Sequence, residues 1–249
     1  MRKYTDFAYY YDSLTQNVEY KKRAEYFDSI IKKYQKNDGR YLVDLACGTG
    51  SLSEEFFRLG YDVLGIDYSE EMLTSALDKK YESGSDIQYV CQDMTCFELY
   101  DKADIIVCAL DSINHLSSAE DIRKTIERAS LYLVSGGLFI FDANTIYKHR
   151  EILGNNAFIF ENEQVFCAWQ NNYHTKDNRV EIFLDFFEKS DNGKYDRYSE
   201  DFSEIAIPSE EMDKFLTDCG FEIIAHFDDD TFEPVHEKTQ RIIFVAQKK

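Results

Sequence analysis

The stretch that most constrains the fold is YLVDLACGTG, which runs from Tyr41 to Gly50. It begins as a short, largely apolar run that contains Asp44, continues into a turn of small residues, and gives way to helix-compatible residues from Ser51. A strand that ends in a glycine turn and opens a helix offers free N–H groups and lets a ligand approach the backbone closely. In a doubly wound α/β sheet, ligands bind at the carboxyl ends of the strands. The stretch therefore predicts such a sheet, with a ligand site at this turn.

The glycine pattern of the turn narrows the choice of ligand. A dinucleotide fingerprint would place a third glycine at position 53, where this chain has Ser53, and Ala46 stands where an upstream glycine is usual. The pattern D-x-A-C-G-x-G instead resembles motif I of the class I S-adenosylmethionine (SAM) methyltransferases. The resemblance implies that SAM is the cofactor, that S-adenosylhomocysteine is the product, and that the turn contacts the cofactor through Asp44, Ala46, Cys47, Gly48 and Gly50.

Acidic residues close the next two predicted strands. Asp67 ends the strand expected over 61–67, where a carboxylate can accept hydrogen bonds from both ribose hydroxyls of an adenosine. NAD and SAM share that ribose, so Asp67 does not separate them, and a solvated strand-end carboxylate is the alternative. Asp93 follows the strand expected over 87–91 and resembles the methyltransferase residue that accepts from the adenine amino group, although it could also be a helix N-cap. The resemblance assigns further cofactor contacts to Tyr20, Tyr68, Met72, Gln92, Met94 and Ala109.

The segment after the fourth strand is expected to lie at the reactive end of the cofactor. Residues 103–110 form a continuous apolar run, which is typical of a central parallel strand buried on both faces. Asp111 and His115 follow it and are the polar candidates to deprotonate or orient a methyl acceptor. The alternative is that Asp111 only organises the loop through side-chain to backbone hydrogen bonds, and that His115 has no chemical role.

The N-terminal tyrosines extend the resemblance. Tyr11, followed by Asp12, and the later Tyr20 are similar to a Y-D…Y pattern found in a methyltransferase subgroup with small-molecule acceptors. In that subgroup such tyrosines help to close over the donor, which makes Tyr11 a third catalytic candidate. Lys22 and Arg23 stand where a tryptophan is common, so the resemblance is incomplete at this point.

The order of the predicted elements specifies the architecture. Five strand-then-connection units run to about residue 142, which predicts a parallel sheet with helices on both faces. Residues 131–142 resemble the L-K-P-G-G segment of the same family, and the fifth strand is expected over 138–142. Over 152–207 the helical pattern stops, and turn signals separate aromatic and β-branched stretches such as 157–169 and 180–188, which indicates an antiparallel meander of three or so strands. A helix from Ser209 and two strands finish the chain.

We therefore expect an α/β, Rossmann-like, seven-stranded and mostly parallel sheet with its last strand antiparallel. An antiparallel β meander is inserted after the fifth strand. We expect residues 1–150 and 208–249 to form the SAM-binding domain and residues 151–207 to form a subdomain on the substrate side.

The composition limits the binding partners, metal sites and cellular location that we expect. The net charge of −19 argues against a nucleic-acid phosphate backbone, because neutralising phosphates requires clustered lysines and arginines. The six cysteines form no C-x-x-C pair and no histidines lie at metal-ligand spacing, so no metal is expected. No apolar run is long enough to span a membrane, and no apolar segment follows the first residues as a signal peptide would require. A reducing cytoplasm is the expected location.

Together these patterns predict a SAM-dependent methyltransferase that transfers a methyl group to a nitrogen or oxygen atom of a small molecule by in-line displacement. A sulfonium is already a good leaving group, so positioning accounts for much of the expected rate and a strong catalytic residue is not required. The sequence leaves open an NAD-dependent oxidoreductase, a non-catalytic SAM-binding protein, and a methyltransferase that acts on nucleic acid or protein.

Overall fold

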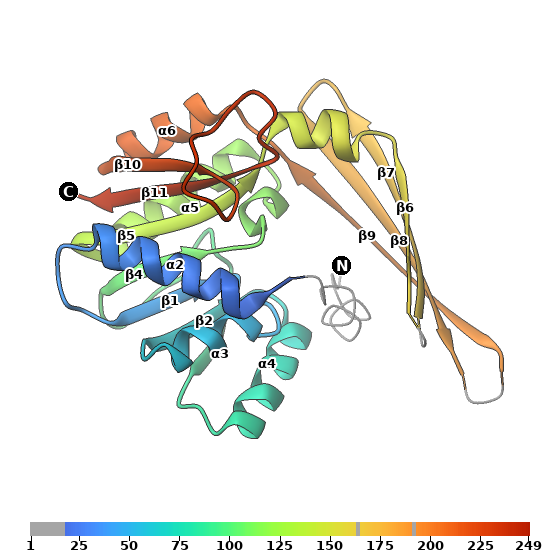
Figure 1. The fold of residues 1–249 in the computed structure, drawn as a ribbon, viewed down its shortest axis with the longest axis horizontal. Coiled ribbons are helices and arrows are strands. Elements are labelled where there is room, and N and C mark those ends of the chain that lie inside the picture. The colour runs from blue at the N-terminus through green and yellow to red at the C-terminus, as the bar shows by residue number, and fades with distance from the viewer. Residues whose placement is uncertain (1–17, 163–164, 191–192) are drawn as a thin grey trace.

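A seven-stranded sheet forms the centre of the molecule (Figure 1). The computed structural model describes residues 18–162, 165–190 and 193–249. The strand order is β10-β11-β5-β4-β1-β2-β3, and β11 runs antiparallel to both of its neighbours. The strands are β1 (Tyr41–Leu45), β2 (Asp62–Asp67), β3 (Gln88–Cys91), β4 (Ala103–Cys108), β5 (Leu133–Asn144), β10 (Phe221–Asp228) and β11 (Arg241–Lys248).

The apolar runs of the sequence occupy the middle of this sheet. β4 lies between β1 and β5, and its residues Ile105 to Cys108 are completely buried. A parallel strand covered on both faces has no polar side to offer, which explains the unbroken apolar run. The predicted mostly parallel sheet with an antiparallel last strand is confirmed.

Helices cover both faces of the sheet. α5 (Ala119–Tyr132) and α6 (Ser209–Asp218) pack on one face, whereas α2 (Tyr20–Tyr34) and α3 (Ser51–Arg58) pack on the other. α4 (Glu70–Ser83) contacts α3 and the β2–β3 edge. Within the described chain, none of the helices combines the length and hydrophobicity needed to cross a lipid bilayer.

Two helix starts follow the expected capping chemistry. The Ser69 hydroxyl accepts a hydrogen bond from the Met72 N–H at 3.1 Å and so begins α4. The Ser118 hydroxyl accepts from the Asp121 N–H at 3.2 Å and begins α5. Each cap satisfies one of the N–H groups that a helix start leaves without an intrahelical partner.

A separate four-stranded antiparallel sheet projects to one side of the main sheet (Figure 1, right). A π-helix, η2 (Lys148–Leu153), leads into it from β5. Its strands, in the order β6-β7-β8-β9, are β6 (Ala157–Glu161), β7 (Val165–His174), β8 (Arg179–Lys189) and β9 (Tyr195–Ile205). Val180, Ile182, Leu184 and Phe186 alternate along β8 and are buried together in a core of its own.

The structure differs from the sequence-based expectation in the number of strands in the inserted sheet and in the residue at which β5 begins. The inserted sheet has four strands rather than about three, because the stretch expected as one strand over 157–169 contains β6 and the start of β7. β5 begins at Leu133 rather than at residue 138, because Leu133 pairs with Ala103 at the start of β4.

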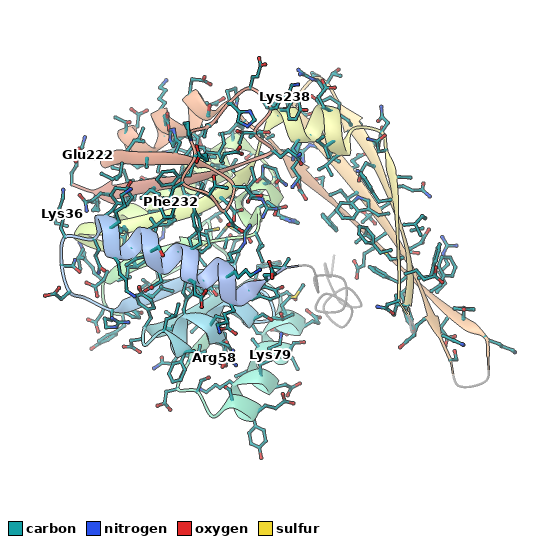
Figure 2. The ribbon with its side chains drawn as sticks, viewed as in Figure 1. Lys36, Arg58, Lys79, Glu222, Phe232 and Lys238 are labelled. Carbon is teal, nitrogen blue, oxygen red and sulfur yellow. The ribbon has the colours of Figure 1, made fainter. Side chains whose placement is uncertain are left out.

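The loop between β10 and β11 folds back against the first helix. Phe232, labelled in Figure 2, places its ring 5.2 Å from that of Tyr26 in α2 and 5.2 Å from that of Phe227 in β10. The Tyr26 hydroxyl donates to the Thr231 carbonyl at 2.5 Å. These contacts bring the acidic residues of this loop close to the carboxyl end of the main sheet.

Candidate functional site

The turn after β1 is held by the carboxylate that ends β2. Asp67 accepts hydrogen bonds from the Gly48 N–H and the Ser69 N–H, each at 2.8 Å. The Cys47 N–H donates to the Ile66 carbonyl at 2.9 Å. Burial raises the pKa of Asp67, and the N–H groups of Ser69 and Gly48 oppose that rise. The turn is thus rigidly tied to the neighbouring strand before any ligand is bound.

Left-handed backbone conformations explain the small residues of the turn. Ala46, Gly48 and Gly50 have φ values of 61°, 55° and 74°. A Cβ on Gly50 would lie 2.5 Å from the Tyr89 hydroxyl, so packing requires glycine there. A Cβ on Gly48 would meet nothing within 4 Å. Gly48 therefore faces open space, as a backbone that lies against a ligand must.

Asp44 lies beneath the turn and is only 2% exposed. Its carboxylate accepts a hydrogen bond from the Ser53 hydroxyl at 2.5 Å. Burial raises the pKa of Asp44 to about 7, although the Ser53 hydrogen bond opposes the shift. A small pocket at this point is lined by residues that the sequence predicted to contact the cofactor: Tyr20, Asp44, Ala46, Cys47, Gly48 and Ala109.

The predicted adenosine-binding residues lie at the ends of β2 and β3. One oxygen of Asp93 accepts from the Thr95 N–H and hydroxyl, both at 2.7 Å, so that oxygen organises the following turn. The Gln92 side chain is engaged at both ends by the backbone of Glu98. Tyr68 is 66% exposed, Met72 is buried, and Met94 packs against the main core. Their contacts with a cofactor remain predictions.

The segment after β4 is strained and is held from β5. Leu110 and Asp111 are consecutive non-glycine residues with φ values of 60° and 51°. Asp142, which is completely buried, accepts the backbone N–H of both, at 2.8 Å from Leu110. Arg23 of α2 donates to Asp142 at 2.8 Å and forms an ion pair with it. A left-handed conformation costs a non-glycine residue roughly 1–2 kcal/mol, and these contacts maintain it here.

Asp111 is already partnered. Its carboxylate accepts from the Arg241 guanidinium of β11 and, at 2.9 Å, from the Asn144 amide. Burial alone would raise the pKa of Asp111, but the Arg241 and Lys148 cations outweigh it and hold that pKa well below its usual range. Burial in turn lowers the pKa of Lys148. A carboxylate held this firmly in its charged form removes protons poorly at neutral pH, so its geometry suits orientation better than base catalysis.

His115 lies at the end of the 3-10 helix η1 (Ser112–His115). Its ring stacks on Phe202 of β9 with 5.2 Å between centroids, and its Nε2 is 3.9 Å from Oε1 of Glu204. Asp111, His115 and Glu204 each offer a metal-ligating atom within 4.8 Å of the others. Tyr11, the third predicted catalytic residue, lies outside the described residues.

A cavity of about 520 Å³ lies between this segment and the four-stranded sheet. Leu110 lines both this cavity and the small pocket at the turn after β1, so the two spaces adjoin. We call this small pocket the donor pocket. Both sheets contribute to the walls, which include Asp111, His115, Lys148, Trp169, Phe202, Glu204 and Arg241. The cavity is thus placed where a molecule bound in it could reach a group carried by the cofactor.

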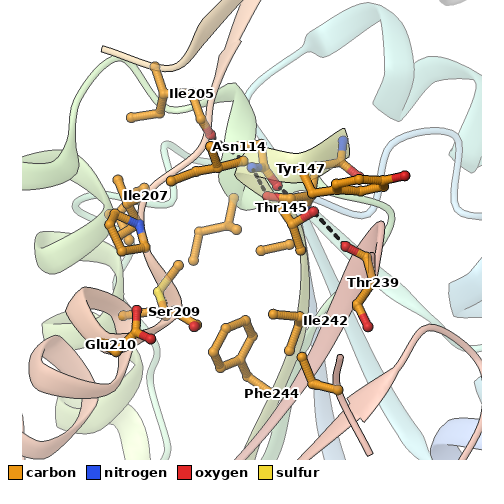
Figure 3. A pocket seen from close by; sticks show the side chains of 18 of the residues that line it. Asn114, Thr145, Tyr147, Ile205, Ile207, Ser209, Glu210, Thr239, Ile242 and Phe244 are labelled. Atoms are coloured by element: carbon orange, nitrogen blue, oxygen red, sulfur yellow. Dashed lines mark hydrogen bonds between the residues drawn. The ribbon is translucent and has the colours of Figure 1, made fainter. Parts of the chain in front are cut away.

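A second pocket, of about 270 Å³, is shown in Figure 3. Its walls combine apolar side chains, such as Ile207, Ile242 and Phe244, with polar ones, and the Thr145 hydroxyl donates to the Thr239 carbonyl. None of its lining residues borders the donor pocket or the larger cavity. We therefore assign the site to the larger cavity.

Sequence patterns missed several residues of this cavity. Glu204, Lys148 and Arg241 line it from β9, η2 and β11, and none belongs to a local motif. Asn144 of β5 does not line the cavity, but its amide supports Asp111, which does. The one available signal concerns Glu204, the acidic residue that directly precedes the apolar run from Ile205 to Ile207. A carboxylate next to a buried run is a candidate for burial itself.

Comparison with known proteins agrees with this geometry. Residues 42–137 match the model of a methyltransferase domain family. The crystal structure of a SAM-dependent methyltransferase from Clostridium acetobutylicum ATCC 824 has a TM-score of 0.89, 32% identity and 98% coverage of both chains. The protein "Putative methyltransferase YqeM" of Bacillus subtilis (strain 168) is 31% identical over 247 residues, covering 98% of this chain and 97% of its own.

A more distant structure shares the fold alone. The sugar N-methyltransferase KedS8 from Streptoalloteichus sp ATCC 53650 has a TM-score of 0.77 with 18% identity, and the match covers 96% of this chain and 93% of that one. The glycine turn, the order of the strands and the two full-length relatives above 30% identity lead to one conclusion. This chain belongs to the class I SAM-dependent methyltransferase family, and it is an enzyme that uses SAM as its cofactor.

Proposed function

We propose that this methyltransferase transfers the SAM methyl group to a nitrogen or oxygen atom of a small molecule bound in the 520 Å³ cavity. The observation that carries the proposal is the position of Leu110, which borders both the donor pocket and this cavity. An acceptor held there would have direct access to the donor's methyl group. In-line displacement needs little more than that alignment, which can contribute about 7–11 kcal/mol to lowering a barrier.

We propose that the predicted cofactor residues divide the SAM molecule between them. Asp67 would accept from the ribose hydroxyls, Asp93 from the adenine amino group, and Asp44 would face the cationic methionine end. The open space at Gly48 is consistent with a ligand lying against the turn. With both oxygens of Asp67 engaged by backbone N–H groups, its remaining lone pairs would receive the ribose.

Size and charge favour a small molecule over a polymer as the acceptor. The cavity is comparable with the pockets that hold drug-sized ligands. The net charge of −19 disfavours nucleic acid. The fold-level neighbour KedS8 acts on a sugar, which is in keeping with a small acceptor.

The test is a screen for S-adenosylhomocysteine release from the protein, SAM and pooled small amines, alcohols and phenols, with mass spectrometry of any methylated product. A methylated small molecule, formed more slowly when Trp169→Ala alters the cavity wall, supports the proposal. Turnover only with a protein or nucleic-acid acceptor would refute it.

A further inference from the structure

Glu204 is a buried carboxylate that the predicted site did not contain. It lies on β9 of the four-stranded sheet, is 4% exposed, and lines the acceptor cavity. Its Oε2 accepts from the Asn144 amide at 3.0 Å and lies 3.3 Å from Nε2 of His149. For its Oε1, the described contact is Nε2 of His115 at 3.9 Å, which is longer than a hydrogen bond.

The partners of this carboxylate fix its orientation. His149 is completely buried and directs Nδ1 at the Asn178 carbonyl, 2.9 Å away, and Nε2 at Glu204. Asn144 and His149 thus occupy Oε2 on the buried side, whereas Oε1 is the oxygen nearer to His115 in the cavity wall.

Asn144 holds the Glu204 carboxylate in the same orientation. Its amide nitrogen donates to both Glu204 and Asp111, whereas its oxygen accepts from the Lys148 ammonium at 2.8 Å. Carboxylates accept and ammonium groups donate, so this orientation of the amide satisfies all three neighbours. The network fixes Glu204 and Asp111 beside each other, facing the cavity.

The rest of the cavity suits a cation. Its described lining contains five carboxylates against three arginine and lysine cations. Phe160, Trp169 and Phe202 add aromatic faces, and the rings of Phe160 and Trp169 are 5.9 Å apart. Aromatic faces and carboxylates together are the groups that recognise ammonium ions.

We propose that the acceptor is an amine and that its reacting nitrogen binds at Oε1 of Glu204. This inference rests on the proposed function and names its substrate class. The amine enters as an ammonium ion and gives one proton to Nε2 of His115. The nitrogen lone pair then forms a bond to the SAM methyl carbon, the carbon–sulfur bond breaks, and its electron pair stays on sulfur.

The charge balance of this step explains why a carboxylate belongs there. A neutral amine and the SAM sulfonium become a methylated ammonium and neutral S-adenosylhomocysteine, so one positive charge moves from sulfur to nitrogen. Glu204 stabilises that charge as it develops, which is the effect that lowers a barrier. A hydroxyl acceptor that gives its proton to a base becomes a neutral ether, so no lasting cation is left for a carboxylate to stabilise.

The test uses probes that do not depend on the natural acceptor. Benzylamine and benzyl alcohol, and cyclohexylamine and cyclohexanol, are titrated at neutral pH into protein saturated with S-adenosylhomocysteine. We expect each amine to bind about 10- to 100-fold more tightly than its alcohol, the range of one charge-assisted hydrogen bond. Glu204→Gln should abolish that preference. The matched control is Asp201→Asn, which removes an exposed carboxylate from the same strand and should keep it.

The affinity for S-adenosylhomocysteine confirms that each variant is folded. Failure of the amines to bind, equal binding of amine and alcohol, or a preference that survives in Glu204→Gln would each overturn the inference. Tight binding of Mn²⁺ at Asp111, His115 and Glu204 without any amine preference would do the same. Methylation of alcohols alone would leave the proposed function intact and refute the amine, whereas the absence of any methylated small molecule would refute the proposed function itself.

Discussion

The affinity of this enzyme for SAM should depend on pH through Asp44. Burial raises the pKa of this carboxyl from 3.8 to about 7, so much of it is protonated in the unliganded protein below that pH. SAM carries a sulfonium and an α-ammonium group, and a cationic ligand in the pocket that Asp44 lines favours the carboxylate. Binding should therefore release a proton, and affinity should rise with pH.

The size of the effect follows from proton linkage. Release of one proton makes the affinity rise about tenfold per pH unit between about pH 5 and 6, with the slope vanishing above about pH 7. Calorimetric titrations in buffers of different ionisation enthalpy would count the protons released. The pH is kept below 7 because the α-amino group of the ligand titrates near about 8.

Unfolding provides a second readout of the same carboxyl, with the opposite dependence on pH. The folded protein holds the Asp44 proton more tightly than the unfolded chain, so the free energy of unfolding should fall as pH rises from about 4 to about 7. The difference of about 3 pH units corresponds to about 4 kcal/mol. Asp44→Asn keeps the size of the side chain and should remove both dependences. A wild-type affinity that is flat from pH 5 to pH 7, or an equal slope in Asp44→Asn, would refute this reasoning.

Four further substitutions test the turn after β1 and the residues that support the site. Gly48→Ala should leave the melting temperature within a few degrees of the wild-type value but weaken SAM binding at least tenfold, because its Cβ would enter the space that the ligand is expected to occupy. Unchanged affinity would show that the ligand does not lie against this turn. Gly50→Ala should instead lower the free energy of unfolding, because its Cβ would meet the Tyr89 hydroxyl. Denaturant unfolding measures this, and an unchanged free energy would contradict it. Asp67→Ala should cost about 1.5–3 kcal/mol of SAM affinity in calorimetry. Asp142→Asn should destabilise the fold by about 1.5–3 kcal/mol, because it removes the buried partner of Arg23 and leaves that cation only the more exposed Asp229 and Asp230. An unfolding midpoint equal to that of the wild type would contradict this.

The main sheet could be predicted from sequence because its signals are local. Most of the parallel strands are apolar runs, and a glycine or a capping residue follows the strand, as Gly48 follows β1 and Ser69 follows β2. Such patterns need no information about distant residues. The fold and the cofactor class were therefore accessible, and the cofactor residues of the turn share one short motif.

The inserted sheet was predicted less well because its turns carry weaker signals. The connection between β6 and β7 contains neither glycine nor proline, so the sequence pattern predicted one strand where the structure has two. Glu204 lies on a strand with several other acidic residues, and the apolar run that follows it is only a weak signal that this one faces the interior. Only the pairing of β9 with β8 and its contact with η1 identify the buried one.

Asp111 illustrates a different limit. Its position after a central strand led us to predict a place at the reactive end of the cofactor, and it lines the cavity that we propose for the acceptor. Its partner Arg241 follows 130 residues later, on β11, and no local pattern links the two. A residue predicted as a possible base is thus held as a carboxylate by a contact that only the folded chain creates.

The most direct measurement is a crystal structure of this protein with SAM bound. We expect the adenosine to lie between Asp67 and Asp93, and the sulfonium methyl to point past Leu110 into the 520 Å³ cavity. SAM bound away from the turn, or with its methyl group directed away from that cavity, would contradict the assignment of the cavity as the acceptor site.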